Sequence, residues 1–211
     1  MGIAERKERE REQKRNDIID AAERLFFSKG FGNTTMDEVA KEAEFSKGTL
    51  YLYFKSKEDL YLAITIRGLA LLEESFRKAI QIGRTGLEKV KNIGEAYLEF
   101  ASKYPDYFNA MIYYESNELD LQDAESNAQA CEMQGMKTLQ VVVEAVMIGM
   151  QDGSIRDDLD PMLVATVLWG NSTGIITITT LRGEHLREQH GMNIEDVVAT
   201  SFEMTMRALQ K

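Results

Sequence analysis

Apolar residues recur at helical spacing along most of the chain. The first such stripe consists of Ile18, Ala22, Leu25 and Phe26. It ends at Lys29 and Gly30, a cation followed by a glycine, which is the composition of a helix C-terminus. The two runs of β-branched residues, 141–143 and 175–180, are short and lie inside longer helical patterns. With only two prolines in 211 residues, the pattern predicts an all-α protein.

Residues 34–46 are predicted to hold a short helix and a tight turn. Thr35 is a favourable N-cap residue, and Glu38 three positions later completes a capping box. Apolar side chains follow at helical spacing, at Met36, Val39, Ala40 and Ala43. Glu44 and Phe45 interrupt this period, so we expect the chain to turn there.

A second short helix is predicted over about 47–54, with Ser46 as its N-cap. Its inward positions are Leu50, Tyr53 and Phe54, and its opposite side carries Gly48, Tyr51, Leu52 and Lys55. Ser56 and Asp59 then form another capping box, which begins the next helix. Two helices joined by a tight turn are the geometry of a helix-turn-helix, in which the second helix enters the DNA major groove.

The rest of the chain is predicted to be helical as well. Helices are expected at about 57–82, 87–101, from Pro105 onward, and at about 125–151, 161–182 and 193–210. The clearest start is Asp160 followed by Pro161, an N-cap and then a proline in the first helical turn. Asn193 is the expected N-cap of the last helix, and residues 116–124 are expected to form an acidic loop.

The net charge of −10 by itself argues against nucleic acid as a partner. The charge is not spread evenly, however. Residues 1–60 hold 12 Lys and Arg against 13 Asp and Glu, whereas residues 61–211 hold 13 against 22. Residues 45–57 contain three lysines and no acid. Phosphate contacts depend on local charge, so this segment can face DNA while DNA repels the acidic remainder.

Catalytic motifs are absent from the sequence, which has no H-E-x-x-H, G-x-S-x-G, G-x-x-x-x-G-K-[ST] or G-x-G-x-x-G. His185 and His190, with Glu184 and Glu188 beside them, suggest either a metal site or a solvated surface, and no cysteine joins them. The single cysteine, Cys131, rules out an internal disulfide and is expected to be a small buried apolar residue. We therefore predict no enzyme activity, no cofactor and no metal.

The first fifteen residues carry charges of both signs and lack the apolar core of a signal peptide. No run of about 18 apolar residues follows, so we expect a cytoplasmic protein without a membrane span. Residues 5–15 have two interpretations. They either extend the first helix as a solvated segment or form an arm that contacts DNA through Arg6, Lys7, Arg9 and Arg11.

Residues 39–60, V-A-x-x-A-x-F-S-x-G-T-L-Y-x-Y-F-x-S-K-E-D-L, resemble the DNA-binding segment of the TetR/AcrR family of bacterial transcriptional regulators. Residues 18–26 resemble the first helix of that family, and the resemblance covers about 15–62. One position departs from the pattern. Glu44 stands where the family usually has glycine, at a turn position that favours positive φ, and a side chain there costs about 1 kcal/mol.

The resemblance implies an N-terminal three-helix helix-turn-helix domain, residues 1–60, and a helical bundle, residues 61–211, that binds a ligand and dimerises. It implies a homodimer through about 161–182 and 193–210 that binds a palindromic double-stranded DNA operator, most simply as a repressor released by a small effector. Thr35 and Tyr53 would bind phosphates, and Lys57 would anchor the DNA backbone. The full set of DNA-binding candidates is Thr35, Ser46, Lys47, Gly48, Thr49, Tyr51, Tyr53, Lys55 and Lys57.

Methionines and aromatic residues are plentiful in the expected bundle and have two interpretations, ordinary core or the adaptable lining of an apolar ligand site. The candidate lining residues are Tyr97, Phe100, Phe108, Met111, Tyr114, Met136, Met147 and Trp169. The last two helices likewise suit either the core of one subunit or half of a dimer. Other functions remain open, namely a ligand-independent or activating regulator, one that responds to a protein partner, or a helical enzyme.

Overall fold

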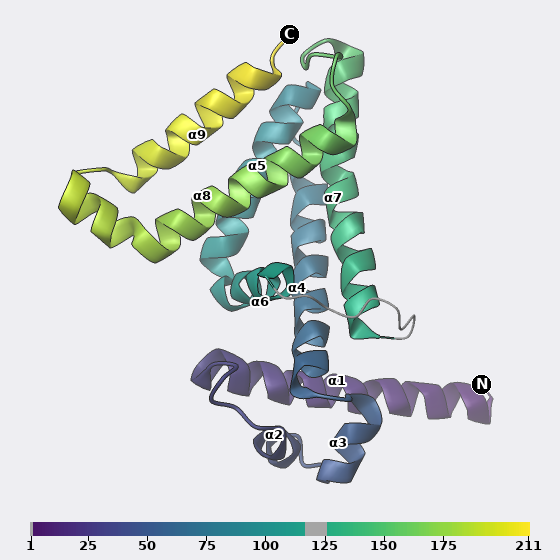
Figure 1. Cartoon of the computed structure of the whole chain (residues 1–211). Helices are drawn as coiled ribbons and strands as arrows, with labels where there is room; N and C mark the ends of the chain where they lie inside the picture. The colour runs from purple at the N-terminus through teal and green to yellow at the C-terminus, as the bar shows by residue number, and fades with distance from the viewer. Residues whose placement is uncertain (1, 117–125) are drawn as a thin grey trace. The chain divides into compact units, whose positions relative to one another are not determined.

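The computed structural model describes residues 2–116 and 126–211, and within these ranges it contains α-helices and no β-strand (Figure 1). The helices are α1 (Ile3–Lys29), α2 (Met36–Glu42), α3 (Lys47–Tyr53), α4 (Lys57–Ala79), α5 (Gly86–Lys103), α6 (Pro105–Ser116), α7 (Asn127–Asp152), α8 (Pro161–His190) and α9 (Ile194–Leu209). The predicted all-α fold is confirmed. The predicted acidic loop lies outside the described residues except for Ser116, which ends α6.

The chain packs as two compact units. Residues 1–69 and 106–134 form the N-terminal unit, and residues 70–105 and 135–211 form the C-terminal unit. Thus α6 and the start of α7 pack with the helix-turn-helix, and α4 begins in one unit and ends in the other. This division describes packing, and the functional boundary at residue 60 stays a prediction.

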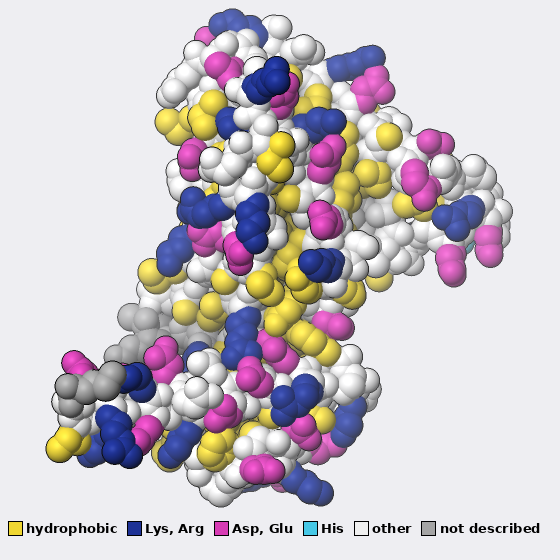
Figure 2. All heavy atoms as spheres, turned by 180° about the vertical axis from the view of Figure 1, so that it is seen from behind, with side chains coloured by type: hydrophobic (Ala, Val, Ile, Leu, Met, Phe, Trp, Pro, Cys, Tyr) yellow, Lys and Arg dark blue, Asp and Glu magenta, His cyan; other side chains and the backbone are white. Residues whose placement is uncertain are grey.

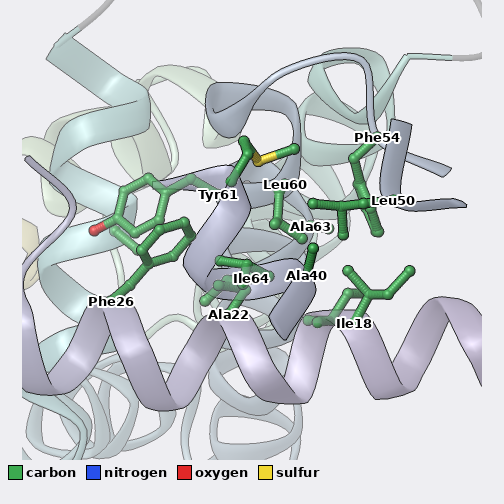
Figure 3. Packing of buried hydrophobic residues seen from close by; sticks show 14 residues of the cluster. Ile18, Ala22, Phe26, Ala40, Leu50, Phe54, Leu60, Tyr61, Ala63 and Ile64 are labelled. Atoms are coloured by element: carbon green, nitrogen blue, oxygen red, sulfur yellow. The ribbon is translucent and has the colours of Figure 1, made fainter. Parts of the chain in front are cut away.

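The core of the N-terminal unit is formed where α1 meets α3 and α4 (Figure 3). Ile18, Leu50 and Leu60 are fully buried there, one from each helix. Burying such a side chain contributes about 1.5–3 kcal/mol, so these contacts fix the orientation of the short helices. The rings of Phe26 and Tyr61 extend the core, with an edge-to-face contact at 5.5 Å.

The caps predicted at Thr35 and Asp160 are present. The Thr35 hydroxyl accepts a hydrogen bond from the Glu38 amide at 3.3 Å, and the Glu38 carboxylate accepts one from the Thr35 amide at 2.9 Å. Asp160 accepts bonds from two amides at the start of α8. Asn193 occupies the N-cap position of α9, but its side chain makes no capping bond.

Three helices show the largest differences from the predicted bounds. The charged N-terminal stretch continues α1 back to Ile3, with an ion pair between Arg6 and Glu10 at 2.8 Å, so it is helical. Helix α4 ends at Ala79, three residues before the predicted end. Helix α8 continues beyond residue 182 to His190, because the chain first adopts a left-handed conformation, with φ of 62°, at Gly191.

In the C-terminal unit, α5 and α7 approach each other so closely that their backbones touch. A Cβ atom added at Gly86 would lie 1.9 Å from the backbone nitrogen of Gly149, so position 86 requires glycine. A Cβ atom added at Gly149 would instead lie 2.5 Å from the side chain of Ile155. The Gly86 amide also donates to the Asp152 carboxylate at 2.7 Å. This end of α5 is therefore held by backbone contact and by a hydrogen bond.

Helices α8 and α9 form an antiparallel pair in the C-terminal unit (Figure 1). Much of α8 is exposed, including large apolar side chains such as Leu163, at 67%, and Leu181, at 76%. By length and composition alone α8 could cross a membrane, which qualifies the prediction that no segment could. That indication is weak, because a helix at a subunit interface has the same composition.

Candidate DNA-binding surface and ligand cavity

Helix α3 presents a short exposed surface. Its Leu50 is fully buried and anchors it to the core, while Tyr51 is 45% exposed and Leu52 is 81% exposed. The Ser46 hydroxyl accepts a hydrogen bond from the Thr49 amide at 3.0 Å and caps the helix. Lys47 and Gly48 are also exposed, and Tyr53 is half-buried against the core. The DNA-binding candidates on α3 thus share one small region.

The turn between α2 and α3 has the positive φ that was expected at position 44, although glutamate stands there instead of glycine. Glu44 adopts φ of 59°, the only positive φ of a non-glycine residue among those described. The Phe45 amide donates to the Ala40 carbonyl at 2.9 Å and the Glu44 amide donates to the Lys41 carbonyl at 3.2 Å. This is the Schellman arrangement of a helix end. It keeps the turn tight although Glu44 carries a side chain.

Thr35, a predicted phosphate ligand, already has a partner for its hydroxyl, which donates to the Glu38 carboxylate at 3.0 Å. Bonds from Lys29 and from the amide and hydroxyl of Thr35 lower the pKa of Glu38 to about 2. To donate a hydrogen bond to a phosphate, the Thr35 hydroxyl would therefore have to give up its hydrogen bond to the Glu38 carboxylate.

Lys57, which was predicted to anchor the DNA backbone, has hydrogen-bond acceptors within the chain. Its ammonium donates to the carbonyl oxygen of Phe31 at 2.9 Å and to that of Thr34 at 3.1 Å. Lys55, by contrast, is exposed, and its amide donates to the Asp59 carboxylate at 2.9 Å. The Lys57 side chain is of intermediate exposure.

Charges of both signs are mixed on the face of the molecule that Figure 2 shows. Lys and Arg side chains are interspersed there with Asp and Glu rather than gathered into one patch. Lys47 itself is paired with Asp37 of α2, at 2.6 Å, and this hydrogen bond raises the pKa of Lys47. The positive charge expected from residues 45–57 is thus partly balanced by Asp37, an acid from another segment.

Two of the predicted ligand-binding residues lie together in a cavity of the C-terminal unit. The rings of Tyr97 and Trp169 stack at 5.2 Å, and the Tyr97 hydroxyl hydrogen bonds with Thr173 at 3.0 Å. The cavity measures about 50 Å³. Its lining residues are Phe76, Val90, Ile93, Gly94, Tyr97, Val142, Leu168, Trp169, Asn171, Ser172, Ser201, Phe202, Thr205 and Met206. None of these described residues is charged, so the cavity suits an uncharged group.

The other six candidates lie elsewhere. Phe100 is buried beside a different groove on α4 and α5, while Met136 and Met147 are 45% and 44% exposed on α7. The remaining three belong to the N-terminal unit, where Phe108 and Met111 are buried and the Tyr114 hydroxyl donates to the Glu132 carboxylate. The eight residues therefore do not line one pocket.

Two important residues of the cavity were not predicted. The ring of Phe202 on α9 lies over Gly94 on α5, where an added Cβ atom would be 2.8 Å from the ring. A glycine in the middle of an otherwise good helix was the available signal for such a close approach. Phe202 is one of several apolar residues in the last helix, and nothing in the sequence marks it out from the others.

The residues considered for other chemistry have ordinary surroundings. The rings of His185 and His190 lie 5.9 Å apart on an exposed part of α8, and no cluster of potential metal ligands occurs among the described residues. Cys131 is fully buried, and this burial raises the pKa of its thiol to about 12. Such a thiol is not an activated nucleophile.

Comparison with known proteins identifies similar sequences. Residues 18–64 match the family model described as bacterial regulatory proteins, tetR family. The chain is 30% identical over 151 residues to the HTH-type transcriptional regulator YhgD of Bacillus subtilis, covering 72% of this chain and 76% of that one. It is 32% identical over 90 residues to the HTH-type transcriptional activator FasR of Mycolicibacterium smegmatis, covering 43% of this chain and only 41% of that protein.

A solved structure has the same fold along nearly the whole chain. It is the crystal structure of the transcriptional regulator FadR from Bacillus subtilis in complex with stearoyl-CoA. The two superpose with a TM-score of 0.70 at 19% identity, covering 92% of this chain and 98% of that one. The likeness therefore extends beyond the helix-turn-helix to the helices that follow it.

Proposed function

We propose, from the premise that this chain belongs to the TetR family of bacterial regulatory proteins and is a transcriptional regulator rather than an enzyme, that it binds a palindromic operator as a homodimer. The observation that carries this proposal is the exposed surface of α3. A capped seven-residue helix, anchored by one buried leucine, offers Gly48, Thr49 and Tyr51 to a major groove. A protein that binds an operator works in the cytoplasm.

The roles proposed on α3 follow from side-chain chemistry. Lys47 can donate to guanine N7 and O6, and the Thr49 methyl can contact a thymine methyl. Gly48 has no atom within 4 Å of an added Cβ apart from the Ser46 hydroxyl at 3.8 Å, so its surface is open to a close approach by DNA. Ser46 and Tyr53 would support this surface, with Tyr53 and Lys55 near phosphates.

The proposed dimer uses the exposed apolar side chains of α8 and α9. Leu163, Val167 and Leu181 of α8 and Met204 of α9 are each at least 60% exposed. Side chains of this kind, gathered on two helices, are typical of an interface. A two-fold axis through these helices would place two copies of α3 against the two halves of a palindrome.

The proposed effector is a small molecule with an apolar, uncharged part that enters the Tyr97–Trp169 cavity. The FadR structure of similar fold contains stearoyl-CoA, so long-chain acyl compounds are the first to test. A cavity of about 50 Å³ is far below the ~300 Å³ or more that drug-sized ligands occupy, so binding must displace lining side chains. One of these side chains is Phe76, near the end of α4. Its displacement would therefore move α4, the helix that follows α3 in the chain.

The sign of regulation follows from which state the effector prefers. We propose a repressor that releases its operator, because displaced lining residues would favour a conformation other than the one that fits DNA. Activation is the second candidate, and it is favoured by the relative FasR, whose name describes an activator.

The test of operator binding begins with selection of duplexes from a random pool by the wild-type protein. The selected sequences should be palindromic. Lys47→Ala should then relax the preference at one position in each half-site, at a cost of about 1–3 kcal/mol. Lys91→Ala, on the exposed surface of α5, is the matched control and should change nothing. Selection of no common sequence, or equal effects of both variants, would contradict the proposal.

The effector is tested by fluorescence, because Trp169 is the only tryptophan and lines the cavity. Long-chain acyl-CoA and free fatty acids should shift its emission and weaken operator binding. A tenfold loss of operator affinity requires about 1.4 kcal/mol of coupling, and the operator must weaken effector binding by the same factor. An acyl compound that shifts Trp169 emission yet leaves operator affinity unchanged would contradict the switch. One that strengthens operator binding would indicate the opposite sign.

A further inference from the structure

Helix α3 carries one charged side chain, and that side chain is already paired. Its sequence from Lys47 to Tyr53 is K-G-T-L-Y-L-Y, so Lys47 is its only cation. The Lys47 ammonium lies 2.6 Å from a carboxylate oxygen of Asp37, which comes from α2. Both side chains are exposed, at 58% and 65%, so the pair sits on the surface proposed to face DNA.

The pair changes what α3 offers to DNA. Non-specific binding depends on free positive charge near phosphates, whatever the base sequence. The Asp37 carboxylate lies 2.6 Å from the Lys47 ammonium, so a phosphate near the pair experiences little net positive charge. The carboxylate also repels the phosphate directly. The Lys47 ammonium has three donors, and one bond to Asp37 leaves the others for a base acceptor. The carboxylate also restricts the directions in which the ammonium can point.

We propose that Asp37 is a specificity-determining residue that acts by positioning Lys47. It weakens indiscriminate phosphate contacts more than contacts with the correct base, and so raises the ratio of operator affinity to non-specific affinity. This inference rests on the proposed operator binding by α3. It assigns a role in DNA recognition to an acidic residue on α2, the helix next to the one that enters the groove.

A second role for Asp37 has to be separated from this one. As an acid in the first turn of α2 it also stabilises the helix N-terminus. That role affects folding stability but not the preference for one duplex over another. The discriminating quantities are therefore the ratio of the two affinities and the salt dependence of each.

The variant that tests the proposal is Asp37→Asn, which keeps the size of the side chain and removes its charge. Its matched control is Glu44→Gln, which removes one charge from the turn before α3. The Glu44 side chain forms no ion pair within the described part of the chain. Lys47→Met and the double variant of Asp37→Asn with Lys47→Met complete a double-mutant cycle. Each is titrated with the selected operator and with a scrambled duplex at several KCl concentrations.

Asp37→Asn should bind the scrambled duplex more tightly, on the order of two- to fivefold per subunit, which is the range of an exposed ion pair. Operator affinity should rise less, so the ratio falls. The salt slope on scrambled duplex should steepen by about 0.9 per subunit, one additional phosphate contact. In the Lys47→Met background, removing the Asp37 charge should leave the ratio unchanged, as Glu44→Gln should in the wild-type background.

Several results would overturn the proposal. An unchanged or higher ratio in Asp37→Asn would exclude a specificity role. The same fall in ratio when Asp37→Asn is added to the Lys47→Met background, or with Glu44→Gln alone, would mean that any acid here acts directly on DNA and not through Lys47. A wild-type protein that binds operator and scrambled duplex equally would overturn operator binding itself, and this outcome is visible before any variant is compared.

Discussion

The ammonium of Lys57 lies 4.3 Å from the centre of the Phe31 ring and donates a hydrogen bond to the carbonyl oxygen of the same residue at 2.9 Å. A second bond reaches the carbonyl of Thr34. The first residue of α4 thus holds the loop between α1 and α2. Lys57 is therefore expected to stabilise the helix-turn-helix whether or not it also contacts DNA.

Lys57→Met should lower the free energy of unfolding by about 1–3 kcal/mol, because it leaves partly buried carbonyl groups without their donor. Urea titration followed by circular dichroism measures this. Lys41→Met, on the exposed side of α2, is the control and should change stability little. Equal stability of the two variants would mean that water replaces the ammonium at no cost.

Glu44→Gly should stabilise the protein by about 1 kcal/mol, since it removes a side chain from a left-handed backbone position with φ of 59°. Glu44→Ala is the matched control, because it removes the charge but keeps the Cβ atom, and it should give no such gain. Thermal and urea unfolding of both variants decide the matter. A gain in the alanine variant would point to charge rather than to backbone strain.

The capping box of α2 should weaken in acid. The pKa of Glu38 is lowered from 4.5 to about 2, so between these pH values the unfolded chain binds more protons than the folded one. The stabilisation from Glu38 is thus complete above a pH of about 4.5 and is lost as the pH falls towards about 2.

Glu38→Gln should accordingly be less stable than the wild type at neutral pH, and the difference should shrink in acid. Urea midpoints measured at several pH values test this. A difference that stays constant with pH would show that the hydrogen-bond geometry of the side chain matters and its charge does not.

Ile178→Glu should convert the proposed dimer into monomers. Ile178 is 48% exposed on α8, and a glutamate there would bring a charge into the subunit interface without disturbing the core of its own subunit. Sedimentation velocity reports the change, and operator affinity should fall with it. Thr180→Glu lies about 200° further round the helix and should stay dimeric. Dimers of Ile178→Glu would place the interface on another surface.

Local features of the fold followed from the sequence because their causes are local. The cap at Thr35 needs only Glu38 three residues later, and the start of α8 needs only Asp160 before Pro161. The end of α8 was placed too early at residue 182, since the next strong stop signal is Gly191. Periodicity predicts that a segment is helical more securely than where it ends.

The ligand site was harder to predict, because an apolar position indicates burial but not the partner. Tyr97 and Trp169 were chosen for their rings and do stack. Phe108 was chosen on the same grounds and belongs to the core of the other unit, and Met147 is exposed. The orientation of the Lys57 ammonium was likewise beyond the sequence, since its acceptors are backbone carbonyls that could belong to any residue.

The two glycines of α5, one at its first residue and one at its middle, face neighbours with unlike mechanical properties. At Gly86 it meets the backbone of α7, which has no side chain that could yield. At Gly94 it meets only the ring of Phe202, which can turn about its own bonds. Pressure from inside the cavity would therefore not push α5 outward as a whole. The helix would instead pivot about its crossing with α7, and its part beside Trp169 would move the most.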